Sequence, residues 1–432
     1  MMTERVGERA KGRWTDWLVV ALLMSAMIFS FVDRFALSLL VNPIKDDLGV
    51  SDAQLGLLHG VAFGLFYAGM GLPLGWLADR WSRKGTIMVG VGVWSAATAA
   101  CGLAGNYTQL LLARILVGAG EAGLAPASYG IVHDRFPKRS LGRAMSLFQL
   151  GSMVGAGVAM YLAGKVYGFF SASGDAGWHW LLDLAPWQKT FIVLALPGLL
   201  FVPLIAMIRE VRPEANVLGG AAGNLSLVTA LREKPMLYAS LFLGMSGVIA
   251  SSYALLAWMP AVLGREYGMS PEVVGTTYGL VVLIASPAGL LMGGWAADYL
   301  QTRGSPSPHA RIAIFTAAVA LPLTFAMGFV STATGLLATA AALHLVLALP
   351  IGVIPALIQT ISPAAVRGQL SALYVLVVNL IGLGLSPTLV GALSSASAGD
   401  AAGLRHALVL VSVILLLLGL PLIVKVERLL RQ

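Results

Sequence analysis

Long apolar segments follow one another along the whole chain, and short segments that carry most of the charges separate them. A helix that crosses a bilayer needs about 20 consecutive apolar residues, and each of these segments is about that long or longer. The pattern therefore predicts an all-α membrane protein of twelve transmembrane helices. We place them at about 17–41, 52–78, 85–104, 108–132, 142–165, 189–208, 236–263, 271–297, 310–330, 333–359, 369–395 and 404–425.

The sequence also repeats itself. A ten-residue stretch from Gly75 to Lys84 follows the second segment, and a similar stretch from Gly294 to Arg303 follows the eighth, so that Asp79 and Asp298 correspond. These aspartates lie 219 residues apart, close to half of the 432-residue chain. We therefore predict two six-helix pseudo-repeats, 1–208 and 236–432, joined by a polar linker at 209–235. In transporters built from such repeats the substrate site lies where the halves meet.

Composition excludes a soluble globular protein, because 58% of the residues are hydrophobic and only 11% are charged, against about 25% in soluble domains. The net charge of +8 does not indicate nucleic acid, since the basic residues fall in short gaps between apolar segments. The single cysteine, Cys101, lies in an apolar segment, which excludes an intramolecular disulfide or a cysteine metal site. No phosphate-binding loop occurs, and we expect no cofactor.

The basic residues predict the orientation. If both termini share one side, 21 of the 28 lysines and arginines lie on that side and five on the other: Lys45, Lys165, Lys189, Arg265 and Arg405. Cytoplasmic loops carry the excess of positive charge. We therefore predict a multi-pass protein of the cell (inner) membrane with both termini in the cytoplasm.

Four ionisable residues lie inside the apolar segments: Asp33, Arg34, Arg114 and Glu121. Such residues are costly in a bilayer and mark functional sites, and the formal charge of the four sums to zero. From the 1.5 Å rise per residue, Asp33 and Arg34 lie about 12 Å deep and Arg114 about 10 Å deep. Glu121 lies two turns beyond Arg114 on the same face, about 10 Å further in.

This predicts a proton-coupling cluster, in which burial opposes ionisation of Glu121 unless an arginine reaches it. Glu121 would be the principal proton carrier and Asp33 a second acceptor. Arg34 and Arg114 would act as counter-ions or bind an anionic headgroup. The alternative is a static network that holds the first and fourth spans together.

The stretch from Gly75 to Lys84 resembles the G-x-L-A-D-R-x-G-R-K signature of the major facilitator superfamily, with Ser82 at the second glycine. In the second copy Tyr299 stands where arginine is usual. Residues 31–35 (Phe-Val-Asp-Arg-Phe) and 114–123 resemble the spinster branch, which is linked with lysophospholipid and sphingolipid transport. Related anion:cation symporters have a similar Asp-Arg pair in the first span.

The two copies of the signature lie at predicted cytoplasmic helix ends. We interpret them as a cytoplasmic gate that closes one conformational state, with simple topology signalling as the alternative. The gate residues would be Asp79, Arg80, Arg83, Lys84, Arg143, Asp298 and Arg303.

The second half has no comparable intramembrane charge. Its polar residues are isolated, and Tyr253, Tyr374 and Asn379 are weak candidates for substrate contacts together with Arg34, Arg114 and Glu121. A charged first half that faces an apolar second half favours an amphipathic substrate over a sugar.

We therefore predict a monomeric, proton-coupled secondary transporter of a lysophospholipid or sphingolipid by alternating access. A proton-coupled symporter of small organic anions, or a uniporter or scramblase without proton coupling, are the alternatives. An integral-membrane enzyme is disfavoured because the six histidines are scattered singly.

Overall fold

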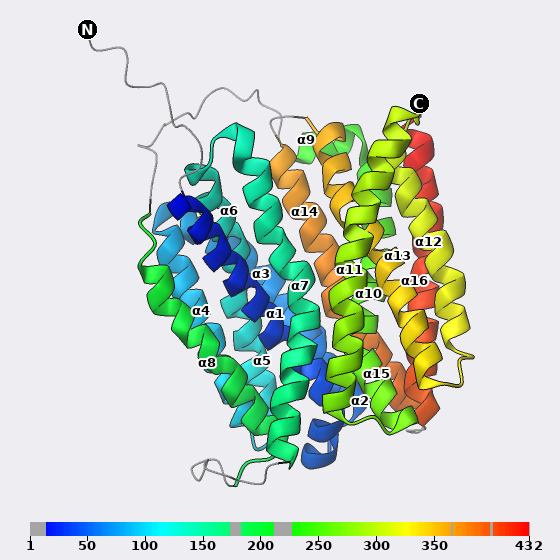
Figure 1. Cartoon of the computed structure of the whole chain (residues 1–432). Coiled ribbons are helices and arrows are strands. Elements are labelled where there is room, and N and C mark those ends of the chain that lie inside the picture. The colour runs from blue at the N-terminus through cyan, green and yellow to red at the C-terminus, as the bar shows by residue number, and fades with distance from the viewer. Residues whose placement is uncertain (1–13, 173–182, 211–226, 364–365, 398–400, 432) are drawn as a thin grey trace.

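The computed structural model describes residues 14–172, 183–210, 227–363, 366–397 and 401–431, without the side chains of Asp79, Lys138, Arg139 and Ala401. The described part contains helices and no strand. Twelve helical spans are long and apolar enough to cross a membrane, which confirms the predicted fold class. The chain is thus a multi-pass membrane protein (Figure 1).

The first six spans form what we call the N-terminal set. Its elements are α1 (Trp14–Leu48), α2 (Asp52–His59), α3 (Val61–Arg80), α4 (Arg83–Gly102), α5 (Tyr107–Glu121), α6 (Leu124–Arg135), α7 (Lys138–Ala172) and α8 (Pro186–Ala206). Two of the six spans are broken helices, since α2 with α3 and α5 with α6 each form one span.

The short helix α9 (Leu227–Glu233) precedes the other six spans, which we call the C-terminal set. Its elements are α10 (Pro235–Tyr267), α11 (Pro271–Thr302), α12 (Pro308–Met327), α13 (Ala333–Ile361), α14 (Arg367–Asn379), the π-helical turn η2 (Leu380–Leu385), α15 (Ser386–Ala396) and α16 (Ala401–Leu429). The last span but one combines α14, η2 and α15. The predicted linker stays a prediction, because residues 211–226 lie outside the described part.

Several helices extend past the apolar segments that predict them. The first apolar segment ends near residue 41, whereas α1 continues to Leu48 through Asn42 and Lys45. These polar side chains form hydrogen bonds with α10 and α2 respectively. Tertiary contacts of this kind stabilise turns that hydropathy alone does not predict.

The two sets meet along α7 and α11, which run side by side through the middle of the bundle (Figure 1). The backbones approach closely there because both helices carry glycines. A Cβ atom on Gly157 would lie 2.6 Å from the backbone of Leu283, and one on Gly164 would lie 2.9 Å from Gly275 Cα. Small residues allow such contacts between membrane helices.

A second contact between the sets joins α2 and α3 to η2 and α15. The helix breaks at Gly60, where a Cβ atom would lie 2.2 Å from both Gly384 O and Thr388 Oγ1. Thr388 Oγ1 also accepts a hydrogen bond from Val61 N (3.2 Å) and donates one to Gly56 O (3.0 Å). Single π-helical turns of this kind are frequent at functional sites.

The bundle has two ends, which we name by residues that lie there. At the Asp52 end α1 gives way to α2, and at the Arg83 end α3 gives way to α4. In Figure 1 the Asp52 end is at the bottom and the Arg83 end, where α16 finishes, is at the top. Nine hydrogen bonds join described residues of the two sets between the Asp52 end and the middle of the bundle. The two sets are therefore held together at the Asp52 end.

Candidate functional site

The four ionisable residues predicted inside the membrane converge between α1 and α5. Asp33, Arg34, Arg114 and Glu121 are only 1–5% exposed. Glu121 is the last residue of α5, and the glycines before it bring α5 close to its neighbours. A Cβ atom on Gly118 would lie 2.6 Å from the backbone of α3. The glycines thus set the position of the Glu121 carboxylate by backbone packing.

Arg34 and Glu121 form an ion pair within the N-terminal set. Arg34 Nη2 lies 2.7 Å and Arg34 Nε 3.2 Å from Glu121 Oε2. Ser30 Oγ donates to the same oxygen at 2.9 Å. The other oxygen, Glu121 Oε1, is buried and has no hydrogen-bond partner among the described residues. Glu121 Oε2 therefore accepts all three of these hydrogen bonds, and Oε1 can carry a proton.

Aromatic rings surround the charged end of Arg34. The centroids of Phe31, Phe63 and Tyr67 lie 4.7, 4.8 and 4.6 Å from its guanidinium carbon. Ring faces attract cations, and more strongly where water is excluded. The guanidinium therefore has favourable contacts besides the Glu121 carboxylate and can keep its charge at this depth.

Arg114 binds the backbone of α1. Its Nη1 donates to Asp33 O at 3.0 Å and its Nη2 to Arg34 O at 3.3 Å. The Asp33 carboxyl lies beside Trp94 and Thr98 of α4, and its buried Oδ1 has no hydrogen-bond partner among the described residues. Arg114 thus joins α5 to α1, while the Asp33 carboxyl has unused acceptor capacity.

The C-terminal set brings two of its three candidate residues to this site. Tyr253 of α10 stacks on Phe35 of α1, with centroids 6.5 Å apart, and lies near Arg34. Its hydroxyl lies 3.5 Å from Oδ1 of Asn379, which directly precedes η2. Tyr374 packs on Phe242 of α10. Arg34 therefore has the N-terminal set on one side and the Tyr253 and Asn379 pair on the other.

At the Arg83 end the candidate gate residues contact several different partners. Arg83 forms an ion pair with Asp134 of α6, and its backbone N–H donates to Glu210 at 3.0 Å. Lys84 Nζ donates to Ala206 O at 3.2 Å. These contacts stay within residues 82–210.

The other gate candidates lie on the surface or outside the description. The Arg80 guanidinium lies over the Trp76 ring and that of Arg303 over the Tyr299 ring, Arg143 and Asp298 are exposed, and the side chain of Asp79 is outside the described residues.

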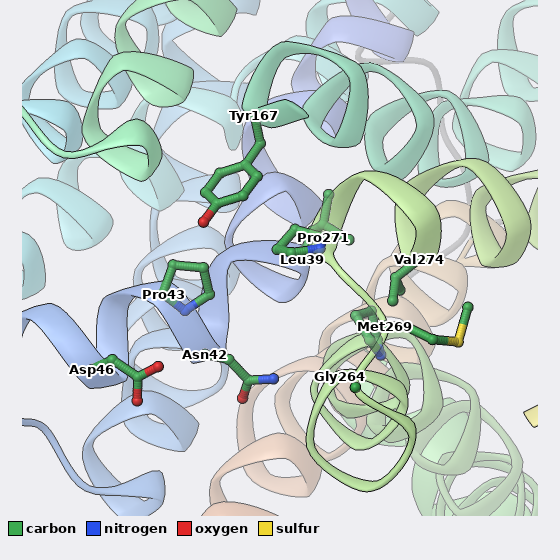
Figure 2. Close-up of a pocket in the computed structure, with 11 residues that line it drawn as sticks. Leu39, Asn42, Pro43, Asp46, Tyr167, Gly264, Met269, Pro271 and Val274 are labelled. Carbon is green, nitrogen blue, oxygen red and sulfur yellow. The ribbon is translucent and has the colours of Figure 1, made fainter. Parts of the chain in front are cut away.

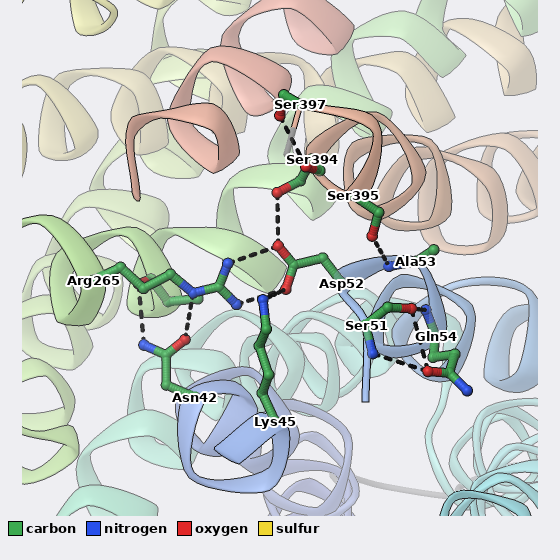
Figure 3. A network of polar contacts seen from close by, with 11 residues as sticks. Asn42, Lys45, Ser51, Asp52, Ala53, Gln54, Arg265, Ser394, Ser395 and Ser397 are labelled. Atoms are coloured by element: carbon green, nitrogen blue, oxygen red, sulfur yellow. Dashed lines mark hydrogen bonds and ion pairs between the residues drawn. The ribbon is translucent and has the colours of Figure 1, made fainter. Parts of the chain in front are cut away.

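Sequence reasoning missed a cluster of polar residues at the Asp52 end (Figure 3). We call it the Asp52 cluster and define it by Asn42, Lys45, Asp52, Arg265 and Ser394. Arg265 Nη1 and Nη2 donate to the two oxygens of Asp52, each at 2.7 Å. Lys45 Nζ (2.8 Å) and Ser394 Oγ (2.7 Å) donate to the same carboxylate. The sequence contains one signal for this cluster: Lys45 and Arg265 are two of the five basic residues predicted on the side opposite the termini.

A cavity of about 270 Å³ adjoins this cluster between α1, α7, α10 and α11 (Figure 2). Asn42 belongs to both the cavity and the cluster. The cavity is lined by Leu39, Asn42, Pro43, Asp46, Tyr167, Pro260, Gly264, Gly268, Met269, Pro271 and Val274. It is therefore distinct from the site around Arg34.

The described residues include no group of three or more His, Cys, Asp or Glu side chains that could hold a metal ion. His344 is buried and lies 2.8 Å (Nε2) from the hydroxyl of Tyr278, which also donates to Leu255 O. Cys101 is buried and free.

The sequence model of the Major Facilitator Superfamily matches residues 23–387. The chain belongs to the major facilitator superfamily. Protein spinster of Drosophila melanogaster is 26% identical over 88% of this chain and 62% of its own length. The chain also resembles an MFS-type efflux pump of Mycolicibacterium smegmatis, at 29% identity over 66% of the chain and 63% of the pump.

A probable L-galactonate transporter of Escherichia coli is 28% identical over 66% of the chain. The match spans 62% of that relative. The chain therefore matches each of these three relatives over less than two thirds of the relative's own length. These names place the chain in a transporter family and not among enzymes.

Solved structures support the same family and the resemblance to the spinster branch. A bacterial homolog to the human lysosomal transporter Spinster, in an inward-facing and occupied conformation, superposes with a TM-score of 0.83 at 25% identity. The match covers 97% of this chain and 98% of that one. A D-xylose-proton symporter, at 18% identity and a TM-score of 0.71 over 94% and 97% of the two chains, shares the fold.

Proposed function

We propose that the protein is a proton-coupled secondary transporter that works by alternating access, with Glu121 as its principal proton carrier. The observation that supports this most directly is the buried Arg34–Glu121 ion pair, in which Glu121 Oε1 has no partner among the described residues. Protonation at Oε1 would remove the negative charge and weaken the attraction to Arg34. The guanidinium would then be available to an anionic substrate.

Asp33 and Arg114 have supporting roles in this proposal. The Asp33 carboxyl is buried near Arg114 and would serve as a second proton acceptor. Arg114 would keep α1 and α5 in register through its two bonds to backbone carbonyls. Its charge would also balance that of whichever carboxylate is ionised.

The substrate we propose is an amphipathic anion of the lysophospholipid or sphingolipid class. The headgroup would bind Arg34, with Tyr253 and Asn379 as further contacts from the C-terminal set and Tyr374 nearer the Arg83 end. The rings around Arg34 and the apolar C-terminal set suit a hydrocarbon chain. The spinster relatives favour this class, whereas the resemblance to a probable L-galactonate transporter favours a small organic anion as the second candidate.

We further propose that the Arg83 end faces the cytoplasm, since it carries most of the basic residues. Hydrogen bonds join the sets at the Asp52 end, which supports the proposal that this is an inward-facing state. The gate candidates Asp79, Arg80, Arg83, Lys84, Arg143, Asp298 and Arg303 would then close the Arg83 end in the opposite state. The proposal is supported by their location at that end and not by contacts between the sets.

Transport by the purified protein in liposomes tests the proposal. We expect uptake of a fluorescent lysophosphatidic acid to rise when a pH gradient is imposed, and Glu121→Gln to abolish the rise while keeping the side-chain volume. Glu272→Gln, which changes an exposed glutamate, is the matched control and should keep the gradient dependence. Undiminished gradient dependence in Glu121→Gln would refute Glu121 as the carrier, and galactonate uptake without lipid uptake would refute the lipid substrate.

A further inference from the structure

We infer that the Asp52 cluster is the gate that holds the two helix sets together at the Asp52 end, and that it must open in each transport cycle. Asp52 begins α2 in the N-terminal set, whereas Arg265 lies in the last turn of α10 and Ser394 lies on α15. The cluster therefore spans the boundary between the sets. Figure 3 shows the side chains converging on the Asp52 carboxylate.

The carboxylate of Asp52 uses all of its acceptor capacity. Arg265 supplies two donors and Lys45 and Ser394 one each, and an ionised carboxylate has about four lone-pair sites. Two parallel bonds between a guanidinium and a carboxylate are among the strong hydrogen bonds in proteins. Asn42 extends the contact, because its Oδ1 accepts from Arg265 Nε at 2.8 Å and its Nδ2 donates to Ala261 O.

Burial distinguishes this contact from the Lys165–Glu272 ion pair between the sets. The side chain of Asp52 is 2% exposed and that of Arg265 is 16% exposed. Lys165 and Glu272 also join the sets, at 3.0 Å between α7 and α11, but their side chains are 47% and 43% exposed. Exposed pairs contribute little, whereas loss of one partner of a buried pair is strongly unfavourable. The Asp52 cluster should therefore control the closed state and the Lys165–Glu272 pair should not.

Backbone packing fixes the position of the carboxylate. Ser51 caps α2 and forms a reciprocal capping box with Gln54. A Cβ atom on Gly391 of α15 would lie 2.3 Å from Asp52 O, and one on Gly56 would lie 2.8 Å from Pro387 O. Because α2 and α15 are in direct backbone contact, any separation of the sets there removes Arg265 and Ser394 from Asp52 together.

Lys45 behaves differently from Arg265, because it belongs to the same set as Asp52. When the sets separate as rigid bodies, the 2.8 Å Lys45–Asp52 ion pair stays intact. The carboxylate then keeps one cation, which lowers the cost of exposing its charge in the open state. Lys45 should thus stabilise closed and open states alike, whereas Arg265 stabilises the closed state alone.

The experiment measures the opening directly with spin labels. One label pair at Thr108 and Ala396 reports on the Asp52 end, and a second pair at Gly142 and Gly368 reports on the Arg83 end; all four positions are exposed. The buried Cys101 is replaced by alanine in every variant. Pulsed electron–electron double resonance then gives the distribution of distances between the two labels at each end, with the protein in liposomes.

We expect Asp52→Asn and Arg265→Gln each to lower the ratio of closed to open molecules at the Asp52 end by roughly tenfold or more. The distance at the Arg83 end should shorten in the same variants, as alternating access requires. Glu272→Gln is the matched control and should change neither distribution. Lys45→Met should change the ratio much less than Arg265→Gln.

The triple variant Lys45→Met, Asp52→Arg and Arg265→Asp should restore the closed population, because it rebuilds the pair with reversed charges and removes the Lys45 charge, which would repel the new guanidinium. Unchanged distributions in Asp52→Asn would overturn the inference, and so would an equal shift in Glu272→Gln. If Asp52→Asn does not fold, a folded triple variant with a wild-type closed population supports the inference, and a folded one that stays open overturns it.

Discussion

Replacement of Gly157 by alanine tests the contact between α7 and α11, the two central helices that belong to different sets. The added Cβ atom would lie 2.6 Å from N, Cα and Cβ of Leu283, whereas ordinary contact begins at 3.4 Å. The helices must therefore separate by about 1 Å, because neither side can relieve the overlap by rotating a side chain. Overpacking of this kind costs about 1–3 kcal/mol, which the better helix propensity of alanine offsets by about 1 kcal/mol.

We expect Gly157→Ala to lower the melting temperature of the purified protein, followed by tryptophan fluorescence. At about 2–4 °C per kcal/mol, a net loss of up to about 2 kcal/mol corresponds to a fall of up to about 8 °C. Gly142→Ala in the same helix is the control, since a Cβ atom there meets nothing within 4 Å, and it should leave the melting temperature unchanged or slightly raised. A Gly157→Ala protein as stable as Gly142→Ala would refute the close backbone contact.

Three further substitutions have expected outcomes. Arg114→Lys removes the planar fork that binds two carbonyl oxygens of α1 and should lower stability by about 1–3 kcal/mol, seen as a lower melting temperature. Tyr278→Phe deprives the buried His344 of its 2.8 Å partner and should cost about 1–2 kcal/mol, whereas an unchanged melting temperature would show the bond to be dispensable. Arg83→Gln breaks the ion pair with the half-buried Asp134; we expect slower transport at unchanged expression, and Arg83→Lys should recover part of the rate.

Hydropathy was sufficient to predict the twelve spans but not their internal breaks. The second span reads as one continuous apolar segment, yet it breaks at Gly60 where its backbone meets Gly384 and Thr388. The π-helical turn at Leu380–Leu385 lies in the same contact. Hydropathy reports whether a residue is apolar, whereas these breaks depend on which helices touch, and residues more than 300 positions apart decide that.

The candidate site was predictable to the extent that burial could be inferred from position. Charges deep in an apolar segment must be neutralised, so Arg34, Arg114 and Glu121 could be selected from the sequence. The sequence did not show which arginine pairs with Glu121, because the long arginine side chains reach over more than one helical turn. Asp52 was missed for the opposite reason: it opens an apolar segment, where a charge is inexpensive, and its burial comes from α10 and α15.

The Arg34–Glu121 and Arg265–Asp52 ion pairs differ in their response to a rigid-body movement of the sets. Arg34 and Glu121 both belong to the N-terminal set, so their pair survives the movement. Arg265 and Asp52 belong to different sets, so the movement breaks their ion pair. In the proposed mechanism the movement changes the surroundings of Arg34 on the side of Tyr253, the residue that stacks on α1 from the C-terminal set.

The proton site and the gate should therefore be separable by mutation. A substitution at the gate should redistribute the conformations while transport keeps its dependence on the pH gradient. A substitution of Glu121 should remove the gradient dependence while the Asp52 cluster stays able to close. Because the two sites share no partner, their effects on the conformational ratio should add in the double variant. Strong non-additivity would instead show that the charge state of Glu121 acts on the Asp52 end through the packing of α1 or α10, the helices that contribute residues to both sites.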